Sequence, residues 1–290
     1  MTALRTSLVA RRLGHAALGR VAPELAGRRA TDIFSDTRAL GTHPDDTVPL
    51  GACRFEVSGD PDVRGGYLWG QEGPAALLVH GWGMDSSSMH GLVPPLRALG
   101  YMVAAFDAPA HGVCPGSQAT MTQFTRATGA VLDALADVRV VVAHSLGSIA
   151  AVGALAARPG QRVDGLTLIA PTCTVTGVLE RWSRSELRLR RPIVERIYTE
   201  LRRRNGVPVS HWDIVGLGGG LGCPVQVIHD PGDDVVPYSE AQAVAAGLPH
   251  VRLAVTPGLG HFGILMAPAV KNLITAFVTT HASKNEEAVG

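Results

Sequence analysis

The stretch Val138-Arg-Val-Val-Val-Ala-His-Ser-Leu-Gly-Ser-Ile-Ala-Ala-Val152 decides the fold of this chain. It begins as a run of β-branched residues, which predicts a strand buried on both faces, as in a parallel sheet. It continues into an alanine-rich segment, 149–157, which predicts a helix. Since no residues are left for a loop, the strand must turn sharply into the helix. Such a bend would expose the Ser145 hydroxyl at the carboxyl edge of the sheet, beside a helix N-terminus.

The same alternation of buried strand and helix continues on both sides of this stretch. A capping box at Thr120 to Gln123 starts a predicted helix that runs to about residue 136. A helix is also predicted from residue 85 or 86 to about 99, and Pro94-Pro95 must interrupt or kink it. Further parallel strands are predicted at 75–79, 102–106, 165–169, 224–229 and 251–255, with an antiparallel edge at 53–58 and 64–70. The pattern is typical of an α/β fold with a mostly parallel central sheet and helices on both faces.

Four segments follow from this pattern. Residues 1–50 form an N-terminal extension, with a helix expected over about 2–25 and no evident chemistry. Residues 51–171 hold the first part of the core. Residues 172–221 interrupt it with a helical, mostly solvated insertion that is dense in Arg and Glu and ends in a flexible, glycine-rich link, and 222–290 complete the core.

Bulk composition excludes several classes of function. The chain has 290 residues with a net charge of +1, so nothing predicts binding to nucleic acid or to an anionic membrane. No stretch reaches the roughly 20 apolar residues of a membrane span. The four cysteines show no metal-type spacing and no disulfide framework, which favours a reducing compartment and a cytoplasmic location. The oligomeric state is not indicated.

The segment Ala143-His-Ser-Leu-Gly147 resembles the G-x-S-x-G nucleophile elbow of the α/β-hydrolase superfamily, with Ala143 in place of the first glycine. His80-Gly-Trp82 and Asp107-Ala-Pro-Ala-His-Gly112 follow two earlier strands and are similar to other landmarks of that superfamily. The resemblance covers about residues 52–171. It implies the α/β-hydrolase fold, with the insertion at 172–221 serving as a helical lid over the active site.

A serine hydroxyl needs a base within hydrogen-bond reach, and that base needs a group that holds its tautomer. Ser145, Asp233 and His261 occur in the order nucleophile, acid, base that this superfamily uses. Asp233 fits the D-x-x-V-P pattern of the superfamily, and Asp234 is the alternative acid. Each of the three lies after a different parallel strand, at the edge where ligands bind in open α/β sheets.

Two backbone N–H groups are expected to stabilise the oxyanion of acyl transfer. That of Leu146 follows from its place at the helix start, and that of Trp82 from the resemblance. Supporting roles in bracing these loops are expected for His80, Gly81, His144 and Gly147. No metal is expected, because the histidines lie at different strand ends beside glycines and have structural roles in the superfamily.

These features predict a carboxylesterase-like serine hydrolase without a cofactor. Its substrate would be a small molecule with a carboxylic ester, or a related thioester, lactone or amide, cleaved through an acyl-enzyme on Ser145. Two alternatives use the same fold. One is other chemistry on the same triad, namely C–C bond hydrolysis, acyl transfer or cofactor-free peroxidation. The other is a ligand-binding protein with little turnover.

Overall fold

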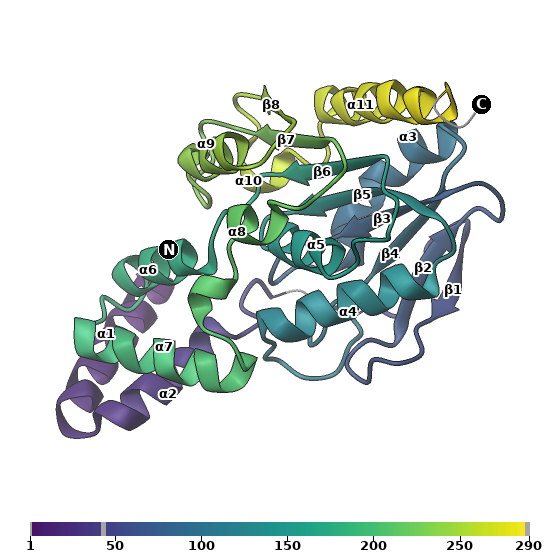
Figure 1. Cartoon of the computed structure of the whole chain (residues 1–290). Helices are drawn as coiled ribbons and strands as arrows, with labels where there is room; N and C mark the ends of the chain where they lie inside the picture. Colours follow the sequence, from purple (N-terminus) through teal and green to yellow (C-terminus); the bar gives the residue numbers. More distant parts are fainter. Residues whose placement is uncertain (1, 42–44, 288–290) are drawn as a thin grey trace.

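An eight-stranded sheet forms the centre of the computed structural model, which describes residues 2–41 and 45–287 (Figure 1). The strands are β1 (Ala52–Glu56), β2 (Gly65–Trp69), β3 (Ala75–Val79), β4 (Met102–Phe106), β5 (Val138–His144), β6 (Gly165–Ile169), β7 (Val225–His229) and β8 (Val251–Val255). Their order in the sheet is β1-β2-β4-β3-β5-β6-β7-β8. All neighbours from β4 to β8 are parallel, whereas β2 is antiparallel to both β1 and β4. The predicted fold class is confirmed.

Helices cover both faces of the sheet and create two apolar cores. On one face lie α4 (Met121–Ala134), α5 (Gly147–Ala156) and α9 (Tyr238–Gly247). On the other lie the 3₁₀ helix η1 (Ser86–Leu92), α3 (Val93–Ala98) and α11 (Pro268–Glu287). The central strands are therefore buried on both sides, as their β-branched composition predicts.

Local signals explain where two of these helices begin. Both hydrogen bonds of the capping box at Thr120 and Gln123 are present, as predicted. The helix expected over 85–99 is interrupted next to Pro94-Pro95. The chain forms η1 and then begins α3 at Val93, which places Pro94-Pro95 in the first helical turn, where a missing N–H leaves no hydrogen bond unmade.

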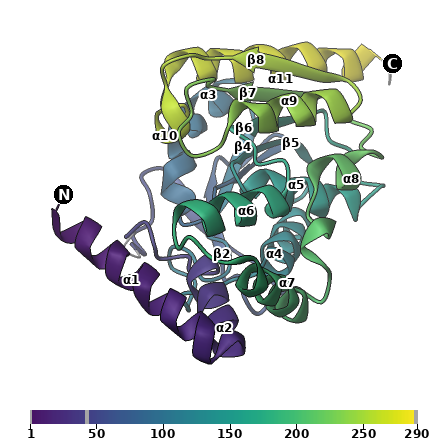
Figure 2. The same ribbon diagram turned by 90° about the vertical axis from the view of Figure 1, so that its left-hand side faces the viewer.

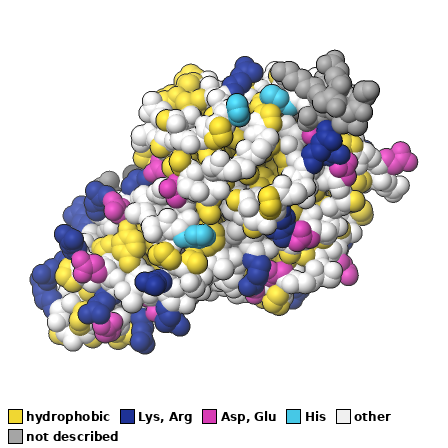
Figure 3. Space-filling model, in the orientation of Figure 1, with side chains coloured by type: hydrophobic (Ala, Val, Ile, Leu, Met, Phe, Trp, Pro, Cys, Tyr) yellow, Lys and Arg dark blue, Asp and Glu magenta, His cyan; other side chains and the backbone are white. Residues whose placement is uncertain are grey.

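The insertion between β6 and β7 contains α6 (Val175–Ser185), α7 (Arg191–Asn205), η2 (Val209–His211) and α8 (Ile214–Gly218). Exposed arginines on it pair with acids of the same helices, for example Arg191 with Glu195. Lys and Arg side chains gather over α1, α2 and α7 in Figure 3, in keeping with the expected solvated face. The first part of the glycine-rich link belongs to α8, which ends at Gly218. A Cβ at Gly218 would lie 2.9 Å from Leu248, so this glycine packs closely against the core.

The N-terminal extension forms two helices, α1 (Thr2–Val21) and α2 (Pro23–Phe34), instead of the single helix expected over 2–25. Figure 2 shows α2 beside α7, and the two helices are in contact. They approach closely at Gly27, where a Cβ would overlap the Arg196 side chain. Ion pairs join Glu24 to Arg196 at 2.5 Å and Asp32 to Arg204 at 2.6 Å.

Residues 35–40, here called the strap, lead from α2 along the loop that follows β4. Thr37 donates its hydroxyl to the Ala110 carbonyl at 2.6 Å. Arg38 donates to the carbonyls of Gly112 and Cys114 at 2.9 and 2.8 Å. The strap is thus fixed to the core of the molecule.

In the described part of the chain, none of the helices combines the length and apolar character needed to cross a membrane.

Candidate active site

The strand-to-helix turn predicted around Ser145 is present. β5 ends at His144 and α5 begins at Gly147, so only two residues form the turn. Ser145 has a φ of 54°, in the left-handed region, as a sharp nucleophile turn requires. No side chain fits at Gly147, because a Cβ there would overlap the His80 carbonyl oxygen. Ala143 is accommodated in β5 as a buried residue.

Three predicted residues come together at this turn. Nε2 of His261 lies 3.1 Å from Oγ of Ser145, and Nδ1 of His261 lies 2.7 Å from Oδ2 of Asp233. Because a carboxylate only accepts, Asp233 holds the proton on Nδ1 and leaves Nε2 to accept from the serine hydroxyl. The alternative acid, Asp234, is exposed and lines the cavity described below.

Asp233 is buried yet well supplied with hydrogen bonds. Its second carboxylate oxygen accepts the backbone N–H groups of Val235 and Val236, both at 2.8 Å. Burial alone would raise the pKa of Asp233, but the hydrogen bonds from His261 and from these N–H groups outweigh it, so the pKa lies below its usual value. The carboxylate therefore stays charged and can stabilise a protonated His261.

Asp230 is a further residue of the site that was not predicted from the sequence. Its Oδ2 accepts the N–H groups of Leu259 and Gly260, at 2.6 and 2.5 Å, in the loop before His261. Its Oδ1 accepts the N–H of Gly232 at 2.8 Å. The bonds from Gly260 and Gly232 lower the pKa of Asp230, so it is a carboxylate. The available signal was an acid directly after a buried strand.

The buried histidines near the site brace its loops. Nε2 of His80 accepts the Ala108 N–H at 3.0 Å, which ties the end of β3 to the end of β4. Nε2 of His144 donates to the His261 carbonyl at 3.0 Å. Burial lowers the pKa of His80, and it lowers the pKa of His144 to about 3, so both are neutral. Among the described residues no three His, Cys, Asp or Glu side chains are grouped to hold a metal ion.

The two expected oxyanion donors belong to segments that lie next to Ser145. Leu146 stands at the start of α5, directly after Ser145. The loop that carries Trp82 lies against Ser145, since a Cβ at Gly81 would be 3.1 Å from the serine Cβ. Within the described chain neither backbone N–H donates to a carbonyl. The role of both groups in catalysis stays a prediction.

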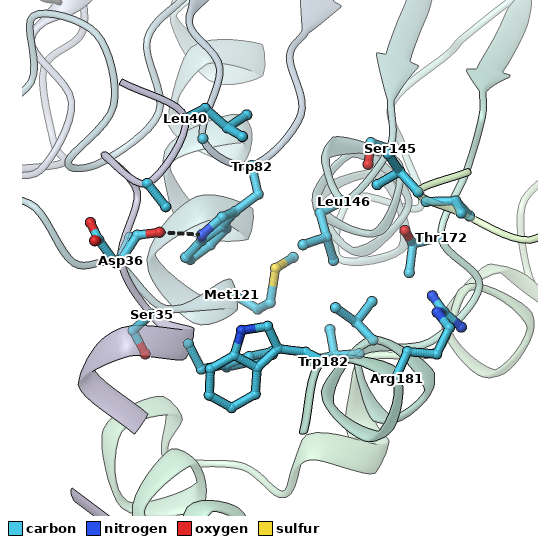
Figure 4. A pocket seen from close by; sticks show the side chains of 18 of the residues that line it. Ser35, Asp36, Leu40, Trp82, Met121, Ser145, Leu146, Thr172, Arg181 and Trp182 are labelled. Carbon is cyan, nitrogen blue, oxygen red and sulfur yellow. Dashed lines mark hydrogen bonds between the residues drawn. The ribbon is translucent and has the colours of Figure 1, made fainter. Parts of the chain in front are cut away.

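A cavity of about 540 Å³ lies over Ser145 (Figure 4). Its walls come from the turn at Ser145, from the loop after β3, from the insertion and from the N-terminal extension. Most of the lining is apolar and includes Phe34, Leu40, Trp82, Met121, Val178 and Trp182. No chemistry is expected of the extension from its sequence, whereas the structure places residues 33–36, 39 and 40 in the wall of this cavity.

Comparison with known proteins finds similarity to hydrolases in both sequence and structure. Residues 73–215 match the family model described as serine aminopeptidase, S33. The pimeloyl-[acyl-carrier protein] methyl ester esterase of Aromatoleum aromaticum is 28% identical over 67% of this chain and 94% of its own length. An esterase of Pyrococcus furiosus has a similar structure, with a TM-score of 0.61 and 17% identity over 82% of this chain and 99% of its own. Mouse α/β-hydrolase domain-containing protein 10 matches with a TM-score of 0.60 and 19% identity over 80% and 98% of the two chains.

Proposed function

We propose that this chain, which has the α/β-hydrolase fold, is a serine hydrolase of that superfamily that cleaves carboxylic esters with Ser145 as its nucleophile. The observation that carries the proposal is the hydrogen-bonded series Ser145–His261–Asp233 at the floor of an apolar cavity. The name of the relative from Aromatoleum aromaticum, a methyl ester esterase, supports an ester as substrate.

The proposed reaction has two steps. Ser145 Oγ attacks the ester carbonyl while His261 Nε2 takes the hydroxyl proton, and the resulting oxyanion binds the N–H groups of Leu146 and Trp82. Collapse of the tetrahedral intermediate breaks the ester C–O bond, and His261 gives its proton to the departing alcohol. A water molecule, deprotonated by His261, then attacks the acyl-enzyme and releases the carboxylic acid and free Ser145. Asp233 stabilises the protonated imidazole in both steps.

We propose that the insertion at 172–221 acts as the lid of this site. Its helix α6 contributes Val175, Val178 and Trp182 to the cavity above Ser145. The apolar lining favours a small-molecule acyl substrate whose acyl group is itself apolar. A cytoplasmic location stays a prediction from the scattered cysteines.

Intact-mass labelling with a fluorophosphonate tests the nucleophile. We expect one adduct on the wild type and none on Ser145→Ala. Ser148→Ala is the matched control, because Ser148 is buried in α5 three residues further on and should leave labelling unchanged. Turnover of p-nitrophenyl esters should be lost with the adduct. An adduct that persists on Ser145→Ala would contradict the assignment, and labelling without turnover of any ester would overturn the esterase proposal.

A further inference from the structure

Phe34 and Trp182 meet in the wall of the cavity although they are far apart in the sequence. Phe34 ends α2 of the N-terminal extension, and Trp182 lies on α6 of the insertion. Their ring centroids are 5.2 Å apart at an interplanar angle of 65°, an edge-to-face contact. Both rings are half-buried, and both line the cavity. Figure 4 shows Trp182 on the side of the cavity opposite Ser145.

The extension is attached firmly enough to define this wall. The indole N–H of Trp82 donates to the Asp36 carbonyl at 3.2 Å, which joins the strap to the loop next to the nucleophile (Figure 4). Ser35 accepts the N–H of Ala119 through its carbonyl at 3.3 Å. Arg12 of α1 donates to the carbonyl of Glu186, just beyond α6, at 2.7 Å. The extension thus contacts both the core and the insertion.

Two polar side chains in the wall of the cavity, Arg181 and Asn205, have partners within the protein. Arg181, the only Lys or Arg among the described lining residues, forms an ion pair with Glu240. Glu240 also accepts the Cys173 N–H at 2.8 Å. Asn205 accepts from Thr122 and donates to its own helix. Since Arg181 is paired and most of the lining is apolar, the cavity offers mainly apolar surface to a ligand, which suits an uncharged hydrocarbon chain.

We propose that the N-terminal extension is part of the active site, with Phe34 and Trp182 together closing the acyl-binding cavity and limiting the length of the uncharged acyl chain that the enzyme accepts. This inference rests on the proposed esterase function. An acyl chain bound to Ser145 runs through the cavity towards the aromatic pair. Chains that reach the pair gain apolar contact, and longer chains collide with it.

The test compares kcat/KM for p-nitrophenyl butyrate, octanoate and laurate. Phe34→Ala and Trp182→Ala should each raise the laurate-to-butyrate ratio by about fivefold or more, since each opens the end of the cavity. Val178→Phe is the opposite change. Val178 lies one helical turn before Trp182 and lines the cavity, so the larger side chain should lower the laurate-to-butyrate ratio of kcat/KM by about tenfold or more.

Tyr198→Ala is the matched control. Tyr198 is a half-buried aromatic residue of α7 and is not one of the residues that line the cavity, so its loss should leave the chain-length profile unchanged. Fluorophosphonate labelling of each variant separates the two proposals. If the wild type is not labelled, the proposed function fails. If all variants are labelled and fold normally but keep the wild-type chain-length profile, the role of the extension is overturned while the esterase assignment stands.

Discussion

The carboxylate of Asp230 accepts the backbone N–H of Gly260 at 2.5 Å, immediately before His261 in the chain. The same oxygen accepts the N–H of Leu259. Asp230 directly follows β7, and Gly260 begins the short helix α10 (Gly260–Gly263) after β8. The position of His261, the proposed general base, therefore depends on a carboxylate that is not hydrogen-bonded to Ser145.

Asp230→Asn should impair the reaction without unfolding the chain. The amide keeps the size of the carboxylate but replaces one acceptor oxygen by a donor, so either Gly232 or the pair Leu259 and Gly260 loses its partner. We expect kcat to fall by roughly 10- to 100-fold with a smaller change in KM, and labelling of Ser145 to slow in parallel. Steady-state kinetics with p-nitrophenyl octanoate and a thermal melt of the variant check this. A fall in melting temperature with unchanged kcat would refute the role of Asp230 in positioning His261.

The neighbouring acids Asp233 and Asp234 provide a matched pair. Asp233→Asn removes the charge that faces Nδ1 of His261, and in a serine protease the same kind of change lowers kcat by about 10⁴-fold, so a loss of that order is expected here. Asp234→Asn alters an exposed carboxylate at the cavity rim and should change kcat by less than about threefold. Equal losses in the two variants would contradict the assignment of Asp233.

The nucleophile turn should tolerate change at one small residue and not at the other. Gly147→Ala places a Cβ against the His80 carbonyl and should destabilise the fold by about 1–3 kcal/mol, with loss of Ser145 labelling. Ala143→Gly only removes a methyl group from β5 and should cost less, about 1 kcal/mol, while labelling persists. Urea unfolding of both variants measures the difference, and a stable, labelled Gly147→Ala protein would show that the turn has more room.

Glu200 should make the stability of the helical region depend on pH. Hydrogen bonds from Arg203 and Arg204, opposed by burial, lower the pKa of Glu200 from 4.5 to about 2. Because the pKa is lower in the folded chain, this stabilisation is complete above about pH 4.5 and is lost as the pH falls through about 2. Glu200→Gln should therefore lower stability by about 1 kcal/mol at pH 7, roughly 2–4 °C in Tm, and the difference should shrink in acid.

Glu195→Gln is the control for that experiment. Glu195 pairs with Arg191 on the same helix, but both side chains are largely exposed, so the change should stay within about 0.5 kcal/mol at every pH. Thermal melts between pH 7 and pH 3 follow both variants. A Glu200→Gln deficit that is constant over this range would show that the ionised carboxylate is not its source.

Features that depend on neighbours in sequence could be predicted from the residues. The runs that became β3, β4, β6 and β8 have the predicted bounds, because short apolar segments between turn residues define buried strands locally. Ser145, Asp233 and His261 each end a strand or follow one, so the sheet itself brings them together.

Features that depend on distant partners could not be predicted. The contact between Phe34 and Trp182 joins segments that share no local pattern, and the end of α2 gives no sign of what it will cover. No role was predicted for Asp230, because the N–H groups that it accepts, those of Leu259 and Gly260, belong to a loop beyond the next strand. Such contacts depend on side-chain packing between separate segments, which the periodicity within one segment does not predict.

The close packing of α2 on α7 also constrains the order in which the molecule assembles. Helix α2 is synthesised before α7, which emerges from the ribosome only after β6 and α6. Until then the side of α2 that packs on α7 lacks that partner, and contacts of such long sequence separation form slowly. The wall that α2 forms with the insertion is therefore completed only after α7 has been synthesised. Before that, the exposed apolar side of α2 is a surface that a chaperone can bind.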